Sequence, residues 1–192
     1  MRELVYYVAV SLDGYIAGPA GEFDAFLSEG DHMAAINERF GDTVPTDIAD
    51  ALGVSRDGGM FDTVLMGWNT YAVGLPFGVV SPYRHLRQIV FSRTRTATGE
   101  NLEVTAADPA STVRALKEQQ GAAIWLCGGG ALAATLVDQI DRLVLKRNPV
   151  LFGAGIPLFG PQPYAPERFE EVGTTTFESG VVLSEYVRPA AV

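Results

Sequence analysis

The chain has 192 residues, of which 47% are hydrophobic and 19% are charged, and its formal net charge is −9. This length and composition predict one well-packed domain over residues 1–192 and exclude extensive disorder. The acidic total argues against nucleic-acid binding, because proteins that bind polyanions present basic surfaces. The apolar run 4–12 is too short for a membrane span or a signal peptide. A single cysteine, Cys127, excludes an intrachain disulfide, and we expect a cytoplasmic protein.

Charged residues are unevenly distributed along the chain. Residues 13–62 contain eleven acids against two arginines, whereas residues 82–99 contain four arginines and no acid. A basic island in an acidic protein suits a small anionic ligand, and the alternative is a solvated basic loop. The two histidines, His32 and His85, have no second ligand at a useful spacing, so no metal site is predicted.

Hydrophobic periodicity predicts strands and helices that alternate along most of the chain. The expected strands cover residues 3–10, 63–66, 86–91, 102–105, 123–127 and 142–150. The expected helices cover 31–40, 109–120 and 130–137, with shorter helical segments at 47–52 and from 67 onward. Two final runs, 170–177 and 181–188, predict a hairpin. This order predicts an α/β fold whose mainly parallel sheet is covered on both faces and carries an antiparallel C-terminal hairpin at one edge.

Three consecutive glycines, residues 128–130, follow the buried strand 123–127 and open the next helix. Glycine lets the backbone approach a ligand closely, and a helix N-terminus offers unpaired N–H groups, so this turn suits a phosphate or pyrophosphate. A turn that serves tight packing alone is the alternative. Gly128-x-Gly130-x-x-Ala133 also matches the Rossmann fingerprint, which normally lies on the first strand with an acid about 20 residues later. Residue 148 is an asparagine, and we interpret the match as coincidental.

Two further segments, 67–70 and 91–93, also follow predicted strands. Ligands of parallel sheets bind outside the carboxyl ends of the strands, so the three segments together predict a site for a dinucleotide, which needs several anchors. Arg93 has the planar fork that matches a ribose 2′-phosphate. This residue favours NADPH over NADH.

Five motifs occur in a fixed order: VSLDGYIA (10–17), LMGWNTY (65–71), VFSR (90–93), WLCGGG (125–130) and NPVLFGAGIPLF (148–159). In this order they resemble the dihydrofolate reductase superfamily, and most closely proteins similar to the C-terminal reductase domain of bifunctional riboflavin-biosynthesis enzymes. The resemblance covers nearly the whole chain. It implies a dihydrofolate-reductase-like three-layer fold, NADPH as the cofactor, and a cis peptide bond between Gly128 and Gly129.

The resemblance also implies where the cofactor binds. The residues expected to frame the nicotinamide are Ala9, Ile16 and Ala17. Those expected to hold the phosphates from opposite sides are Gly67, Trp68, Asn69 and Thr70, and Gly128, Gly129, Gly130, Ala131 and Leu132. Those expected at the adenosine phosphate are Phe91, Ser92 and Arg93.

The proton donor is less well defined by the resemblance. In the folate enzymes an acid near the start of the first long helix contacts the substrate heterocycle, and Asp24 and Asp31 are the candidates for this catalytic role. A solvated surface carboxylate is the alternative for each, and Asp13 is expected to brace its own turn. The loop 41–60 is long enough to cover part of the site as a lid.

Dihydrofolate and the riboflavin intermediate are both anionic, and the acidic segment 13–62, expected to wall the substrate side, would repel them. Arg84 and Arg87 are the cations available to bind the negative charge of such a substrate. This charge pattern departs from what either known substrate needs. We therefore expect an NADPH-dependent reductase of a small heterocyclic or carbonyl substrate, a class that includes 5-amino-6-(5-phosphoribosylamino)uracil-like and pterin-like compounds. The alternative is an NADP(H)-binding protein without turnover, such as a sensor or a degenerate paralogue.

The resemblance finally implies a homodimer, because riboflavin-type reductase domains pair through their sheets and C-terminal regions. The predicted hairpin carries four apolar residues that suit such an interface, Phe177, Val181, Leu183 and Val187. Completion of the core of a single chain by these side chains is the alternative.

Overall fold

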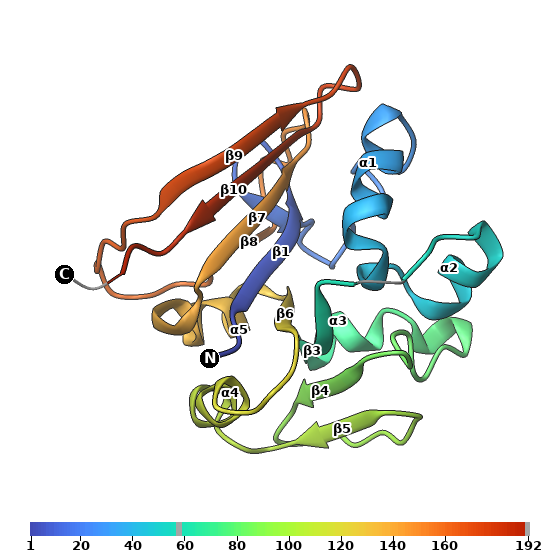
Figure 1. The fold of residues 1–192 in the computed structure, drawn as a ribbon, viewed down its shortest axis with the longest axis vertical. Coiled ribbons are helices and arrows are strands. Elements are labelled where there is room, and N and C mark those ends of the chain that lie inside the picture. The colour runs from blue at the N-terminus through green and yellow to red at the C-terminus, as the bar shows by residue number, and fades with distance from the viewer. Residues whose placement is uncertain (57–58, 191–192) are drawn as a thin grey trace.

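The computed structural model describes residues 1–56 and 59–190, so residues 57–58 of the predicted lid 41–60 lie outside the described part. An eight-stranded sheet with the order β5-β4-β3-β6-β1-β7-β10-β9 forms its centre (Figure 1). The strands are β1 (Leu4–Val10), β3 (Phe61–Gly67), β4 (Arg87–Phe91), β5 (Leu102–Thr105), β6 (Ala123–Gly128), β7 (Arg142–Arg147), β9 (Glu170–Thr176) and β10 (Val182–Val187). The helices are α1 (Asp31–Phe40), α2 (Thr46–Leu52), α3 (Trp68–Ala72), α4 (Pro109–Lys117) and α5 (Gly130–Thr135), with 3₁₀ turns at Gly41–Thr43, Leu75–Phe77 and Val137–Gln139.

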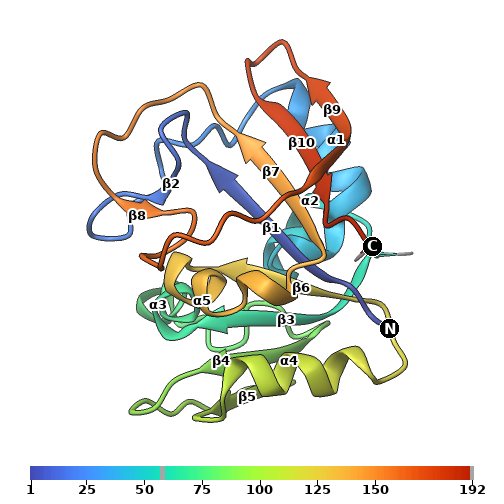
Figure 2. The same cartoon turned by 90° about the vertical axis from the view of Figure 1, so that its left-hand side faces the viewer.

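The sheet has the predicted topology. Strands β5, β4, β3, β6, β1 and β7 pair in parallel, and β10 pairs antiparallel with both β7 and β9. The mainly parallel α/β fold with an antiparallel C-terminal hairpin at one edge is thereby confirmed. Figure 2 shows β9 as the outermost strand on the side away from β5.

Helices cover both faces of the sheet, because successive residues of a buried strand point to opposite sides. On one face Leu65 belongs to a buried cluster with Leu116 of α4 and with residues of α5. On the other face Val64 belongs to a cluster with Phe40 of α1 and Tyr71 of α3. These two cores make the three layers that the resemblance implies (Figure 1). Within the described residues, no helix has the length and apolar character needed to cross a membrane.

Some predicted boundaries differ from the observed ones. The strand expected over 142–150 ends at Arg147, two residues before Pro149, which has no N–H to donate to a ladder. The helices expected to reach residues 120 and 137 end at Lys117 and Thr135. Sequence patterns also missed a small antiparallel sheet of β2 (Tyr15–Ala17) and β8 (Ile156–Pro157). Strands of three and two residues are too short to show a period.

Candidate functional site

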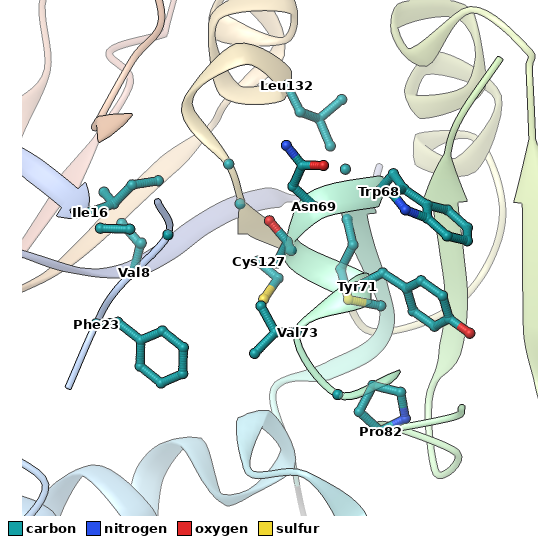
Figure 3. Close-up of a pocket in the computed structure, with 18 of the residues that line it drawn as sticks. Val8, Ile16, Phe23, Trp68, Asn69, Tyr71, Val73, Pro82, Cys127 and Leu132 are labelled. Carbon is teal, nitrogen blue, oxygen red and sulfur yellow. The ribbon is translucent and has the colours of Figure 1, made fainter. Parts of the chain in front are cut away.

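The carboxyl ends of three neighbouring strands meet at one edge of the sheet. The ladder pairs Gly67 of β3 with Phe91 of β4, and Met66 of β3 with Gly128 of β6. The segments 67–70, 91–93 and 128–130 therefore begin side by side. Residues 67–70 and 128–132 line a cavity of about 890 Å³ (Figure 3).

The cavity crosses the carboxyl edge of the sheet rather than lying on one face. Val8 and Leu132 pack with the core cluster under α4 and α5. Met66 and Tyr71 pack with the cluster under α1 and α3. All four side chains line the cavity, so a ligand can extend along the edge from one layer of the fold to the other.

The glycine turn brings the backbone to the cavity. The Gly128–Gly129 bond is cis, as the resemblance implies, and Gly128 has a φ of 141°, a conformation that favours glycine. A Cβ added at Gly128 or Gly129 would have Thr70 Oγ1 as its nearest neighbour, at 3.8 and 3.7 Å. A Cβ added at Gly130 would collide with the carbonyl oxygen of Pro157. The first two glycines thus leave room in the cavity, whereas the third permits close packing of the chain.

The structure places most of the predicted cofactor residues on the cavity wall. Those that line it are Ile16, Ala17, Gly67, Trp68, Asn69, Thr70, Gly128, Gly129, Gly130, Ala131 and Leu132. Those that do not are Ala9, Phe91, Ser92 and Arg93. Val8 lines the cavity in place of Ala9, since adjacent residues of β1 face opposite sides of the sheet.

The segment after β4 continues the same edge beyond the cavity. The Ser92 hydroxyl accepts a hydrogen bond from the backbone N–H of Arg95 at 2.9 Å, which shapes the turn. The Arg93 side chain is exposed and makes no hydrogen bond or ion pair with the described residues. It therefore remains available to an anionic ligand.

A carboxylate braces the wall that β2 and β8 form. Asp13 accepts hydrogen bonds from the Ser11 hydroxyl at 2.6 Å and from the N–H groups of Phe152 and Gly153 at 3.1 and 2.7 Å. The Ser11 hydrogen bond is the largest cause that lowers the Asp13 pKa to about 2. Asp13 thus joins two loops that are far apart in the chain, in agreement with its predicted bracing role.

The two predicted proton donors lie away from the cavity lining. Asp24 is exposed, and neither Asp24 nor Asp31 lines the cavity. Asp31, in the first turn of α1, accepts hydrogen bonds from the N–H groups of Glu178 and Ser179 at 2.7 and 3.0 Å. Its carboxylate fastens α1 to the turn between β9 and β10, which is a structural task. Their catalytic role stays a prediction.

Comparison with known proteins identifies the family. The model of the RibD C-terminal domain matches residues 2–183. The chain belongs to this family. The uncharacterized protein YwjB of Bacillus subtilis is 31% identical over 164 residues, which cover 82% of this chain and 83% of that protein.

Solved structures show the same fold at low sequence identity. A Shewanella protein described as belonging to riboflavin biosynthesis superposes with a TM-score of 0.66 at 24% identity, covering 99% of this chain and 100% of that one. The Thermotoga maritima diaminohydroxyphosphoribosylaminopyrimidine deaminase/5-amino-6-(5-phosphoribosylamino)uracil reductase superposes with a TM-score of 0.64 at 17% identity. The match covers 98% of this chain but 57% of that longer one. The resemblance to the reductase domain of riboflavin enzymes is thereby confirmed.

Sequence patterns missed the part of the cavity that faces α2. It is lined by Phe23, Pro45, Asp47, Ile48, Val73, Phe77, Val79, Pro82, Tyr83 and Cys127. These residues come from several separate segments and follow no shared spacing. Asp47 and Ile48 show that the predicted lid 41–60 does border the site. Of the acids described in residues 13–62, Asp47 alone lines the cavity.

Two neutral polar side chains meet inside the cavity. The Tyr83 phenol and the Cys127 thiol interact electrostatically. Burial raises the pKa of Cys127 to about 12 and raises the pKa of Tyr83 well above its usual range. Both groups therefore keep their protons at neutral pH. Among the described residues, no group of three or more His, Cys, Asp or Glu side chains is placed to hold a metal ion.

Proposed function

We propose that the protein is an NADPH-dependent reductase that transfers a hydride to a small heterocyclic or carbonyl substrate. The observation that carries this proposal is the aligned edge of β4, β3 and β6 with its glycine-lined cavity. An extended dinucleotide suits such an edge, because each carboxyl end supplies a separate anchor.

The cavity has the free space that a pyrophosphate needs. A Cβ at Gly67 would meet nothing within 4 Å, and at Gly128 or Gly129 it would meet only ordinary contacts. Gly67 and Gly128 end the adjacent strands β3 and β6, and Gly129 follows directly, so the space between them is a cradle that side chains would fill. This cradle fits the phosphates of NADPH, with Asn69 and Thr70 on its wall.

Arg93 is the residue proposed to select NADPH over NADH. Its exposed guanidinium follows β4 on the same sheet edge and has no acidic partner among the described residues. A guanidinium binds a phosphate through paired hydrogen bonds. NADH has no 2′-phosphate and therefore cannot accept these hydrogen bonds.

When bound, NADPH supplies a hydride, and reduction of a C=O or C=N bond takes up one further proton. Tyr83 is the residue proposed to hydrogen-bond the oxygen or nitrogen of that bond. Its phenol holds a proton within the cavity, whereas the Tyr71 hydroxyl is already donated to the carbonyl oxygen of Val80 at 2.9 Å. The protein's task is to position the two reactants and exclude water between them.

The test is the affinity for NADPH and NADH in the unmutated protein and in Arg93→Ala. We expect a preference for NADPH, and we expect Arg93→Ala to lose about 1.5–3 kcal/mol of binding free energy for NADPH alone. Arg168→Ala, which removes another exposed arginine in the segment before β9, is the control and should change neither affinity. Equal dissociation constants of the unmutated protein for the two cofactors would contradict the proposal.

Binding of NADP(H) without turnover is the second candidate. The observation that favours it concerns proton donation. The carboxylate of the cavity, Asp47, is paired with Arg84 at 2.7 Å and is ionised, so it holds no proton that it could donate to a substrate. A decrease of NADPH absorbance with a pterin, an aminouracil or a quinone would exclude this candidate.

A further inference from the structure

The end of the cavity opposite the cofactor cradle is built from apolar side chains. Figure 3 shows Asn69 and Leu132 at one end of the cavity and Phe23, Val73 and Pro82 at the other. Further apolar lining comes from α2 and from the segment that joins Val73 to Pro82. We call the following residues the apolar wall: Phe23, Ile48, Val73, Phe77, Val79 and Pro82.

The apolar wall is unusually exposed for side chains of its kind. Phe77 is 82% exposed, Phe23 is 54% exposed, Ile48 is 50% exposed and Val73 is 44% exposed. Single exposed apolar residues are common on protein surfaces, but a group of them around one cavity marks a binding site. Burying them requires a ligand with apolar surface of its own.

No cation of the described residues lines the cavity itself, although Arg84 lies with Phe77 and Val79 around a neighbouring pocket. None of the 14 lysines and arginines, all within the described residues, lines the cavity. Arg84 lies behind Asp47 and pairs with it at 2.7 Å, and it approaches Asp50 at 3.7 Å. Arg87 pairs with Glu103 at 3.2 Å.

These ion pairs determine whether a cation is available to bind a phosphate group in the cavity. The two arginines that the sequence offered for an anionic substrate are each paired with an acid, Arg84 with Asp47 of the cavity lining and Arg87 with Glu103. A phosphate group placed against the apolar wall would find no unpaired cation on the cavity lining, because the charge of Arg84 is already neutralised by Asp47, and burial of an unpaired charge is strongly unfavourable.

Apart from the ion-paired Asp47, the polar groups at this end are neutral hydrogen-bonding groups. Tyr83 offers a phenol, and Cys127 offers a thiol beside it. An uncharged carbonyl oxygen is the complement of a protonated phenol, since it accepts one hydrogen bond and carries no charge to be neutralised.

On the basis of the proposed reductase function, we propose that the substrate is an uncharged, flat compound with a conjugated carbonyl group and no phosphate. In its reduction a hydride forms a C–H bond at the carbonyl carbon, the C=O π bond breaks, and the oxygen takes up a proton from solvent. One NADPH and one proton are consumed for each carbonyl reduced. The phosphoribosyl substrate of the riboflavin enzymes is disfavoured because no cation of the described residues lines the cavity to bind its phosphate.

Equilibrium binding measured by calorimetry tests this substrate class without relying on turnover. The probes are menadione, which is flat, uncharged and carbonyl-bearing, and the pair uridine and uridine 5′-monophosphate, which differ by one phosphate. Each is titrated with and without saturating NADP⁺. We expect menadione to bind at least about tenfold more tightly than uridine 5′-monophosphate, and we expect the phosphate to bring no gain over uridine.

A charge placed in the apolar wall should reverse the discrimination within the uridine pair. Val73→Arg adds a cation just after α3 at the cavity, and it should make uridine 5′-monophosphate bind about tenfold more tightly than uridine. Leu52→Arg is the matched control, because Leu52 ends α2, is 70% exposed and does not line the cavity. It should leave the order of the probes unchanged.

The outcomes separate this inference from the reductase proposal. Tighter binding of uridine 5′-monophosphate than of uridine to the unmutated protein would overturn the substrate class, even if NADPH binds. Failure of menadione to bind at millimolar concentration would overturn it as well. Binding of menadione without any binding of NADPH would support the apolar site and overturn the reductase.

Discussion

Gly129 and Gly130 are adjacent in one turn, yet their missing side chains serve different purposes. Gly129 has extended backbone angles, φ −101° and ψ −170°, which any residue adopts, and its Cβ would point into the cofactor cradle. Gly130 opens α5, and a Cβ there would collide with the backbone at Pro157. The first position is therefore free for ligand, and the second is needed for packing.

This difference predicts opposite effects of two substitutions. Gly129→Val should weaken NADPH binding by about tenfold or more, because the branched side chain fills the space proposed for the pyrophosphate, while the melting temperature stays near that of the unmutated protein. Gly130→Ala should lower the free energy of unfolding by about 1–3 kcal/mol, because the chain must move to admit a methyl group. Calorimetric titration and thermal melts of both variants measure these effects. Undiminished NADPH binding by Gly129→Val would contradict the cradle.

The thiol of Cys127 should react slowly despite lining the cavity. Alkylating agents attack the thiolate, and burial raises the pKa of Cys127 to about 12, so the thiolate is scarce at pH 8. We expect iodoacetamide to label the folded protein far more slowly than the urea-unfolded protein, as followed by mass spectrometry. Equal labelling rates in the two states would show that the thiol is not protected.

At the scale of elements, the cavity depends on segments that are distant in sequence. β2 pairs with β8 across about 140 residues of chain, and both strands line the cavity. Asp13 fastens the loop before β2 to the loop before β8 through the N–H groups of Phe152 and Gly153. In a similar way Asp31 fastens α1 to the hairpin at Glu178 and Ser179. Carboxylate–backbone hydrogen bonds thus hold the loops on which the site is built.

The Asp13 brace predicts a specific loss of stability in acid. The Asp13 pKa is lowered from 3.8 to about 2 in the folded protein, so ionised Asp13 stabilises the fold above about pH 4. That contribution disappears as the pH falls towards 2. Asp13→Asn should melt at a lower temperature than the unmutated protein at pH 7, and the difference should shrink between pH 4 and pH 2. A constant difference across that range of thermal melts would exclude the brace as its cause.

At the scale of the whole molecule, two of the apolar residues of the C-terminal hairpin that were expected at a dimer interface are buried. Val181 and Leu183 are 1% and 7% exposed, so they complete the core of one chain and are not available to a partner. The edge strand β9 instead presents Val172, Thr174 and Thr176, which are exposed and uncharged, with a β-bulge in its pairing to β10 at Val172. An exposed edge strand of this kind is a ready surface for self-association.

We predict a homodimer that uses the edge strand β9. Light scattering at micromolar concentration should give twice the 20.6 kDa mass of one chain. Val172→Glu with Thr174→Glu should shift the mass to that of a monomer, because like charges would face each other across the interface. A mass of 20.6 kDa for the unmutated protein would reject the prediction.

Local patterns in the sequence were sufficient for the elements and for one wall of the site. The apolar runs that became β3 and β6 and the glycine turn at 128–130 depend on residues within a few positions of each other, so their structure can be inferred from spacing. Ordered motifs then identified the family and eleven cavity residues on the cofactor side.

The tertiary structure determined the contacts between distant segments, which local sequence patterns do not contain. The sheet order places β4, β3 and β6 side by side, and packing brings α2 and the segment 73–83 across from the glycine turn. The same packing gives Asp31 its partners in the hairpin and pairs Arg84 with Asp47. These contacts join residues far apart in the chain, and their free energy depends on the shape and charge of surfaces that exist after the sheet has formed. For that reason the sequence determined the side of the cavity proposed to hold the cofactor, and the folded chain determined the side proposed to face the substrate.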